Sequence, residues 1–191
     1  GLTNRLLAPV ADRIYTSFPR LDRFFPSRKI LRTGTPIRNE FYSVPEKTGG
    51  DFTVLVLGGS QGAASINRAM LESYPLLRGS GRILRIIHQT GRSDYENVRK
   101  RYESQSAAGV EVYPFIEKLA ETYARSDLIV SRAGASTLAE IAAVGRPAIL
   151  VPYPFAADDH QRWNALSLVE EGGAEMILDR ELARGGGERL A

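Results

Sequence analysis

The sequence contains no cysteine among its 191 residues. There is therefore no disulfide framework, no thiolate metal site and no thiol nucleophile. No run of eighteen apolar residues occurs, so no segment is expected to span a membrane, and no charged-then-apolar leader opens the chain. The residues present, 43% hydrophobic and 25% charged, are typical of a globular protein of one domain or slightly more. That is enough chain to bury a sizeable core, and the composition is compatible with a cytoplasmic setting.

The net charge of +3 is small and unevenly distributed. Residues 1–42 carry eight Lys and Arg against three Asp and Glu, whereas residues 43–191 carry seventeen against nineteen. A nucleic-acid-binding protein usually gathers basic and aromatic residues on one surface, but here the basic residues are scattered singly. We therefore expect no nucleic-acid partner, although the basic N-terminal stretch could be attracted to an anionic membrane surface.

From residue 52 onward, short apolar runs alternate with segments of helical spacing. Continuous apolar strands separated by helices indicate a parallel sheet covered on both faces, that is, a doubly wound, Rossmann-like α/β domain. Six strands are predicted, within residues 52–59, 82–91, 109–116, 127–134, 147–154 and 174–179. Five helices are predicted between them, within residues 63–74, 93–104, 117–126, 136–145 and 158–173.

The first part of the chain does not fit this domain. Residues 1–43 predict a helix and two strands, too little for a core of their own, and residues 44–51 contain the Pro and Gly of a linker. The last residues, ELARGGGERLA, stop where another helix is expected to begin. We therefore expect a fragment: the tail of one α/β domain (1–43), a linker (44–51) and most of a second domain (52–191).

The loop after the first strand of the main domain is GGSQG, residues 58–62. Glycines let the backbone approach a ligand closely, and Ser60 could cap the following helix. The unpaired N–H groups that begin a helix suit a phosphate. The loop matches neither G-x-G-x-x-G nor the Walker pattern. A phosphate-binding loop and a tight turn with a serine cap both remain open.

The loop after the fourth strand is RAGAST, residues 132–137. Gly134 and Ala135 leave the start of the next helix uncovered. Thr137 and Glu140 match the T-x-x-E capping box, in which Glu140 would fold back onto the Thr137 N–H. The functional alternative sends the Glu140 carboxylate to a ribose diol, as acidic residues do in nucleotide sites.

The loop after the fifth strand leads into a helix through Asp158, Asp159, His160 and Gln161. One adjacent aspartate pair does not supply the convergent oxygen ligands of a Mg²⁺ site, so we interpret both as charges that complement the helix dipole. His160 and Gln161 are expected to point toward the crevice at the carboxyl ends of the strands. Gln161 suits sugar hydroxyls because it can donate and accept hydrogen bonds; a solvated surface glutamine is the alternative.

Three further polar or aromatic residues are interpreted as structural. His88 ends the second strand with no Ser, Cys or carboxylate at a recognisable spacing, which argues against catalysis. Trp163 and Asn164 lie within the last predicted helix, where we expect packing and local hydrogen bonding.

Six motifs, in order and spacing, resemble one family over nearly the whole chain: TGTPIR, GGSQGAASIN, HQTG, YPFI, SRAGASTLAEIAAVGRPAILVPYP and DDHQRWNA. They are similar to the C-terminal half of the MurG family, bacterial transferases that move N-acetylglucosamine from UDP-GlcNAc onto undecaprenyl-linked muramyl-pentapeptide in peptidoglycan synthesis. The resemblance implies a GT-B glycosyltransferase, in which two α/β domains face a cleft and the C-terminal one holds most of the donor. It implies direct inverting transfer without cofactor or metal, and peripheral contact with the cytoplasmic face of the bacterial cell membrane.

The resemblance assigns four residues to the phosphate side of the donor. Ser60 would touch the donor phosphates. Ala135, Ser136 and Thr137 would lie at the start of a helix, near phosphate and sugar.

Four more residues match the nucleoside and sugar positions of the family. The backbone of Ile116 would meet the uracil, and Glu140 would bind the ribose hydroxyls. Gln161 would bind the GlcNAc hydroxyls, and Arg38 would reach the nucleotide from the interdomain connection.

Two departures from the family pattern limit the assignment. The family usually has Asn where Thr35 stands, and its N-terminal glycine-rich loop with a histidine is absent from this chain. No catalytic base is therefore named, and the chain alone is expected to bind the donor without turning it over.

Several other functions remain as alternatives. A UDP-GlcNAc 2-epimerase shares the architecture, but its usual Ser-Gly-Gly and paired glutamates are absent from RAGASTLAE. A GT-B transferase with a different lipid acceptor, or a donor-binding half without activity of its own, would show the same motifs. A nicotinamide dehydrogenase would need G-x-G-x-x-G after its first strand.

Overall fold

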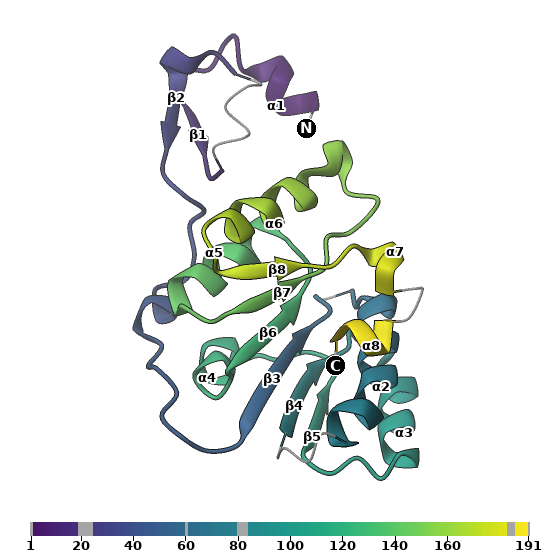
Figure 1. Ribbon diagram of the computed structural model, residues 1–191. Helices are drawn as coiled ribbons and strands as arrows, with labels where there is room; N and C mark the ends of the chain where they lie inside the picture. The colour runs from purple at the N-terminus through teal and green to yellow at the C-terminus, as the bar shows by residue number, and fades with distance from the viewer. Residues whose placement is uncertain (1, 19–24, 60, 80–83, 183–185, 191) are drawn as a thin grey trace.

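A parallel sheet of six strands is the centre of the computed structural model, which describes residues 2–18, 25–59, 61–79, 84–182 and 186–190 (Figure 1). Its strand order is β5-β4-β3-β6-β7-β8. The strands are β3 (Phe52–Leu57), β4 (Leu84–Gln89), β5 (Val110–Tyr113), β6 (Leu128–Ser131), β7 (Ala148–Leu150) and β8 (Ala174–Met176). The first strand of this sheet, β3, lies in its middle. Strands β4 and β5 follow on one side of β3, and β6, β7 and β8 follow on the other, so the strand order reverses between β3 and β6. This confirms the predicted doubly wound α/β fold.

Helices cover both faces of the sheet, as the apolar strands require. They are α2 (Ala64–Gly79), α3 (Tyr95–Ser104), α4 (Leu119–Ala124), α5 (Ala135–Val144), α6 (His160–Glu170), α7 (Asp179–Leu182) and α8 (Gly186–Leu190). Successive side chains of a strand point to opposite faces. Val54 and Val56 of β3 accordingly pack in the hydrophobic cluster under α2 and α3, whereas Leu55 packs in the cluster under α4, α5 and α6.

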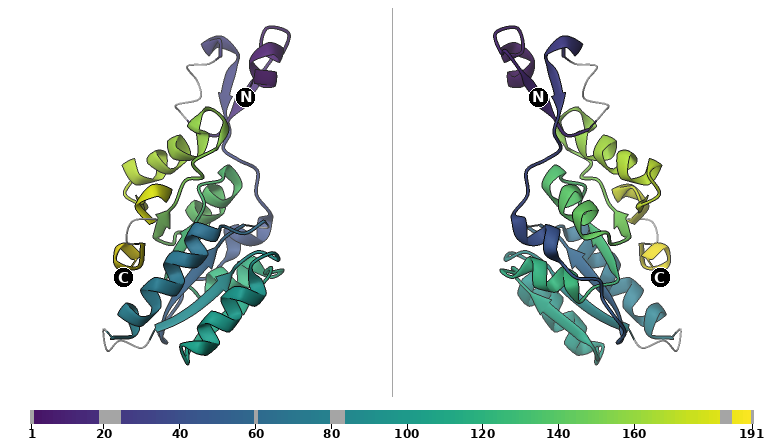
Figure 2. Two further views of the ribbon diagram at one scale, coloured as in Figure 1. Left: turned by 90° about the vertical axis from the view of Figure 1, so that its right-hand side faces the viewer. Right: turned by 90° about the vertical axis from the view of Figure 1, so that its left-hand side faces the viewer.

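The N-terminal segment stands at one end of this domain, joined to it by a single extended stretch (Figure 2). It contains α1 (Leu2–Leu7), β1 (Ile14–Thr16), a short 3-10 turn η2 (Ser27–Lys29) and β2 (Ile30–Arg32). Strands β1 and β2 pair in parallel. Leu6, Val10 and Tyr15 remain 69%, 79% and 66% exposed, so the segment buries little core of its own.

The connection between the two parts packs on the main domain before β3 begins. The short helix η3 (Asn39–Ser43) places Phe41 in the cluster under α4 and α5, fully buried. The Phe41 ring meets the Tyr123 ring edge-on, with centroids 5.8 Å apart. The packing of the main domain thus reaches back into the region that the sequence had grouped with the N-terminal tail.

The stretch before β3 is fixed to the sheet by a charged cluster at the start of β6. The Lys47 ammonium pairs with the Asp127 carboxylate, and the Thr53 N–H donates to Asp127 Oδ2 at 2.7 Å. Burial alone would raise the pKa of Asp127, but the hydrogen bonds from Lys47 and Thr53 outweigh it and hold the pKa below its ordinary value. The ionised form therefore stabilises the fold.

Replacing Asp127 with asparagine should lower the free energy of unfolding at pH 7 by about 1.5 kcal/mol, the size of a hydrogen bond to a charged group. A carboxylate with a lowered folded-state pKa stabilises above its unfolded pKa, and that stability is lost as the pH falls through the folded value. Urea unfolding of both proteins between pH 7 and pH 3 tests this, because the difference between them should shrink toward the acid end. A difference that does not vary with pH would contradict it.

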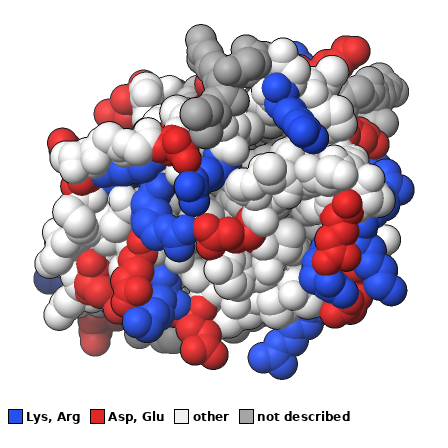
Figure 3. Space-filling model, turned by 90° about the horizontal axis from the view of Figure 1, so that it is seen from below, with Lys and Arg blue, Asp and Glu red and all other residues white. Residues whose placement is uncertain are grey.

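Charges of both signs are mixed on the face of the molecule seen from below (Figure 3). The described residues of that face form no single-sign basic surface of the kind that binds nucleic-acid backbones. In the part of the chain that the structure describes, no helix combines the length and apolar character needed to cross a bilayer.

Candidate functional site

A cavity of about 420 Å³ opens where β3, β4 and β6 end. The last residues of these strands, Leu57, Gln89 and Ser131, contribute to its lining. Strand order reverses between β3 and β6, and ligands of open α/β sheets bind in the crevice at such a reversal. The cavity therefore lies where the fold itself predicts a site.

Four of the eight residues predicted from the sequence line this cavity together: Arg38, Ile116, Thr137 and Glu140. They come from the connection before β3, the loop after β5 and helix α5. The Arg38 guanidinium pairs with Glu40 at 3.0 Å and lies 5.0 Å from the centroid of the buried Phe41 ring. Arg38 is thus held near the cavity by packing on the main domain.

Glu140 lines the cavity and does not cap its own helix. Helix α5 begins at Ala135, with Gly134 in extended conformation at the cap position and no side-chain cap. Thr137 is therefore the third residue of the helix and Glu140 lies in its second turn. The capping-box interpretation is wrong because the helix begins three residues earlier than that box requires.

The Glu140 carboxyl group is partly buried at the cavity wall. Burial raises its pKa, the Arg38 guanidinium opposes this shift, and the Glu40 carboxylate adds to it. A buried carboxylate of this kind gains from accepting hydrogen bonds that replace its lost water. Glu140 is therefore well suited to accept hydrogen bonds from ligand hydroxyls.

The start of α5 carries the other predicted residues of this region. Ala135, Ser136 and Thr137 are its first three residues, whose N–H groups have no partner inside the helix. Only Thr137 among them lines the cavity. The partial positive charge at a helix start favours an anion there.

The backbone of Ile116 is only partly available to a ligand. Its N–H donates to Oε1 of the buried Gln89 at 2.9 Å. The expected contact of this backbone with a base therefore has to be made by the carbonyl. Gln89 was not identified from the sequence, although a polar residue ending an apolar strand is a usable signal.

The glycine-rich loop is described except for Ser60, which lies outside the described residues. Gly59 lines the cavity, and helix α2 begins at Ala64. The structure therefore brings the loop to the cavity without testing the role expected for the Ser60 hydroxyl.

Gln161 does not line the cavity. It is the second residue of α6, and its Oε1 accepts a hydrogen bond from the Tyr153 N–H at 3.0 Å, which closes the loop between β7 and α6.

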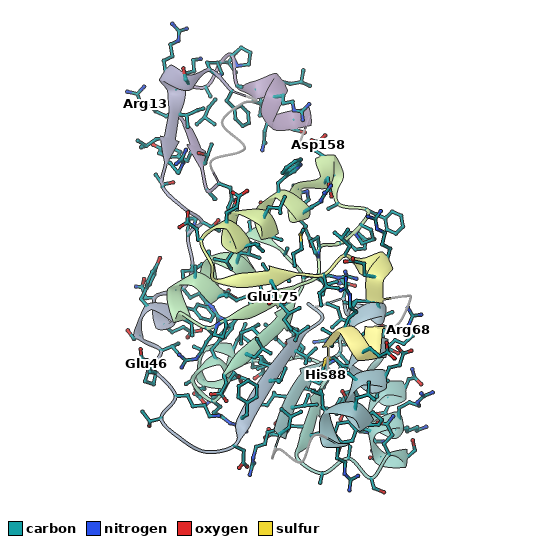
Figure 4. The ribbon with its side chains drawn as sticks, in the orientation of Figure 1. Arg13, Glu46, Arg68, His88, Asp158 and Glu175 are labelled. Carbon is teal, nitrogen blue, oxygen red and sulfur yellow. The ribbon has the colours of Figure 1, made fainter. Side chains whose placement is uncertain are left out.

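Asp159 takes the cap position of α6 in a left-handed conformation, without a side-chain cap. Asp158 pairs with Arg5 of α1 at 3.1 Å, and Figure 4 shows it on the loop that approaches α1. The His160 ring nitrogen Nδ1 lies 2.7 Å from the Ala157 carbonyl oxygen.

Arg132 was missed by the sequence analysis. It lines the cavity, pairs with Asp179 at 2.5 Å and donates to Ser65 Oγ at 2.9 Å. Ser65 belongs to the first turn of α2, and Arg132 lies just before α5. One side chain thus connects the starts of both helices, through partners 47 and 67 positions away in the sequence.

His88 is structural, as its sequence context indicated. It is fully buried, and its ring nitrogens lie 3.1 Å from Tyr102 Oη and 3.0 Å from Asn67 Oδ1. Burial lowers its pKa to about 3, so the ring is neutral at physiological pH.

Asn164 does not bond locally as expected: its Nδ2 donates to the Ala133 carbonyl 31 positions away, at 3.3 Å. Within the described ranges, no three His, Asp or Glu side chains gather as a metal site would require.

Comparison with known proteins adds the family. Residues 53–190 match the Glycosyltransferase family 28 C-terminal domain. A UDP-N-acetylglucosamine--N-acetylmuramyl-(pentapeptide) pyrophosphoryl-undecaprenol N-acetylglucosamine transferase of Geotalea uraniireducens (strain Rf4) is 48% identical over 197 residues, which cover 100% of this chain and 53% of the relative. A transferase of the same name from Solibacter usitatus (strain Ellin6076) is 46% identical over 183 residues, 95% of this chain and 50% of the relative.

Solved structures agree with the fold. The crystal structure of Acinetobacter baumannii MurG superposes with a TM-score of 0.78 at 30% identity, covering all of this chain and 53% of that one. The glycotransferase of kitacinnamycin superposes with a TM-score of 0.64 at 18% identity, covering 95% of this chain and 49% of that one, a likeness of fold alone. This chain spans about half the length of the relatives that it matches. It belongs to glycosyltransferase family 28, whose C-terminal domain it contains.

Proposed function

We propose that the protein containing this chain transfers N-acetylglucosamine from UDP-GlcNAc to undecaprenyl-pyrophosphoryl-MurNAc-pentapeptide, and that this chain supplies the donor site. The observation that carries the proposal is the cavity at the strand reversal, where Glu140, Arg38 and the start of α5 meet. The names of relatives between 46% and 48% identical over almost the whole chain support the substrate assignment. The two enzymatic alternatives, an epimerase and a transferase with another lipid acceptor, gain no support from those names.

The donor would lie along the carboxyl edge of the sheet. Glu140 would accept hydrogen bonds from the ribose hydroxyls, and the Ile116 carbonyl would face the uracil. Arg38 would approach the nucleotide from the connection between the two parts of the chain. Gln161 would donate to the GlcNAc hydroxyls through its Nε2, because its Oε1 already accepts from the Tyr153 N–H.

The diphosphate would be held by backbone at the starts of two helices. The described glycines of the glycine-rich loop lead into α2, and Ala135, Ser136 and Thr137 begin α5. Transfer places growing negative charge on the UDP leaving group, and fixed amide dipoles stabilise such charge without having to reorient. The Ser60 hydroxyl would add one donor to the phosphates.

The reaction itself would need the other part of the protein. The muramyl 4-hydroxyl would attack the anomeric carbon directly, with UDP leaving from the opposite side, so the configuration inverts. We assign the base that accepts the hydroxyl proton to the domain that residues 1–43 would complete, with residues 44–51 as linker and 52–191 as the donor domain. A lipid-linked acceptor would bring the enzyme to the cytoplasmic face of the bacterial cell membrane as a peripheral protein.

Calorimetric titration of the 191-residue chain with UDP tests the donor site. A drug-sized ligand gains about 0.3 kcal/mol per non-hydrogen atom, so UDP should bind with Kd on the order of 10 μM. No transfer of GlcNAc to the lipid acceptor is expected from this chain alone, whereas the full-length protein should transfer it. Heats indistinguishable from dilution, together with a full-length protein inactive on that acceptor, would overturn the proposal.

A further inference from the structure

A buried polar network lies beside the glycine-rich loop and has no part in the function proposed above. Its centre is Asn67 of α2, which is 1% exposed. The Asn67 Nδ2 donates to the Thr90 carbonyl at 3.1 Å and to Asp94 Oδ2 at 2.8 Å. Its Oδ1 lies 3.0 Å from His88 Nε2, and His88 Nδ1 lies 3.1 Å from Tyr102 Oη. Figure 4 labels His88 on the face of the sheet that α2 and α3 cover.

The orientation of every group in this network follows from its neighbours. Two acceptors, the Thr90 carbonyl and the Asp94 carboxylate, face the Asn67 NH₂, so a reversed amide would set oxygen against oxygen. Asn67 Oδ1 must therefore accept, which requires the proton of the neutral His88 ring on Nε2. His88 Nδ1 then accepts from the Tyr102 hydroxyl. Asn67 is thus held in one orientation by three partners.

The turn at Thr90 and Gly91, whose Thr90 carbonyl accepts a hydrogen bond from Asn67, is in backbone contact with the glycine-rich loop. A Cβ added to Gly62 would lie 2.5 Å from the Thr90 carbonyl oxygen. A Cβ added to Gly91 would lie 2.4 Å from both Gly62 Cα and Gly62 N. No side chain separates the two segments, so a displacement of the Thr90–Gly91 turn must move Gly62. A second hydrogen bond also fixes Thr90: its N–H donates to the carbonyl of Tyr113, the last residue of β5, at 2.9 Å.

We propose that Asn67 is a positioning residue: by holding the Thr90 carbonyl, it sets the position of the Gly62 backbone and so of the amides that meet the donor diphosphate. This inference rests on the proposed function, because it assigns the loop to the phosphates. His88 contributes indirectly, because its Nε2–H donates to Asn67 Oδ1 and so holds the Asn67 amide in place.

A purely structural network would behave differently in one respect. Every hydrogen bond in it would contribute to stability, but none would affect the ligand more than another. Tyr102→Phe provides the matched control, since it removes the hydroxyl at the far end of the network and leaves Thr90 and Asp94 bonded. Asn67→Ala removes the bond to the Thr90 carbonyl directly.

The 191-residue chain and both variants are compared by urea unfolding, by UDP titration and by hydrogen exchange at the Gly62 amide, which donates to the Gly59 carbonyl at 3.2 Å. Both variants should unfold at lower urea. Asn67→Ala should raise the Kd for UDP roughly tenfold, the effect of one buried hydrogen bond, and should speed exchange at the Gly62 amide by a similar factor. Tyr102→Phe should change the Kd and the exchange rates less than about twofold.

Equal changes of Kd in the two variants, or unchanged exchange at the Gly62 amide in Asn67→Ala, would overturn the positioning role. If Asn67→Ala does not fold, Asp94→Ala takes its place, because the partly exposed Asp94 is one of the two acceptors that orient the Asn67 amide. It should shift Kd and exchange in the same direction, and no shift would refute the proposal. If the unmodified chain fails to bind UDP, the proposed function fails, while hydrogen exchange in the free protein still decides whether Asn67 positions the loop.

Discussion

Replacing Glu140 with alanine should weaken UDP binding about 100-fold while leaving the fold intact. A carboxylate that accepts from two ribose hydroxyls makes two hydrogen bonds to a charged group, each worth about 1.5 kcal/mol or more. Glu140→Gln keeps one acceptor oxygen without the charge, so its loss should be about tenfold. Titration of the 191-residue chain with UDP measures both, and Glu121→Gln, on the outer surface of α4 where Glu121 pairs with Lys118, is the control.

The ligand itself provides a second control. If Glu140 binds the ribose diol, 2′-deoxy-UDP should bind the unmodified chain more weakly than UDP, and Glu140→Ala should bind the two nucleotides equally. If Glu140→Ala still prefers UDP over 2′-deoxy-UDP, another residue binds the ribose diol. Affinity for UDP should also fall toward acid pH, starting at a higher pH than for an exposed glutamate, because burial raises the pKa of Glu140. Glu140→Gln should lack this part of the pH dependence.

Stability separates this role from a structural one. A carboxyl group whose folded-state pKa is raised destabilises the fold as the pH rises through that value. Glu140→Gln should therefore be at least as stable as the unmodified chain at pH 7, although it binds UDP less tightly. A residue that served only the fold would lose stability and affinity together.

The fold followed from the sequence because its determinants are local and repeated. Apolar runs such as the one at Val54–Leu57 need both faces covered, and each is followed by a helix of suitable spacing. The cap of α5 was predicted less well, since Thr137 and Glu140 carry a valid capping pattern, whereas the extended Gly134 takes the cap position three residues earlier. Local patterns identify a helix more reliably than its first residue.

Part of the site was predictable because a residue's role there depends on the strand end beside it. Glu140, Thr137 and Ile116 meet at one cavity because they follow strands whose carboxyl ends share one edge. Arg38 reaches the same cavity from the connection before β3, a position that only the family resemblance indicated. The contacts of Arg132 with Asp179 and Ser65 join positions far apart in the sequence, and no local pattern announces such pairs. Gln161 was placed at the correct edge, but its bond to the Tyr153 N–H depends on how the loop closes.

Replacing Gly91 with alanine should strongly destabilise the fold beside the glycine-rich loop. Gly91 has a φ of +81°, where an L-residue costs about 1 kcal/mol, and its added Cβ would lie 2.4 Å from Gly62 Cα and N. These are backbone atoms, which cannot rotate away, so overpacking adds roughly 1–3 kcal/mol. The expected loss in the free energy of unfolding is about 3 kcal/mol.

Gly145→Ala separates the conformational cost of a positive φ from the cost of overpacking. Gly145 ends α5 with a φ of +68°, and a Cβ there meets no atom within 4 Å, so only the conformational cost of about 1 kcal/mol applies. Urea unfolding should therefore rank Gly91→Ala roughly 2 kcal/mol below Gly145→Ala. Because the Gly91 methyl group can be accommodated only by moving the Gly62 backbone, Gly91→Ala should also lose UDP affinity, whereas Gly145→Ala should keep it. Equal stabilities of the two variants would mean that the turn and the glycine-rich loop separate freely, and the loop could then not be held in place by the turn behind it.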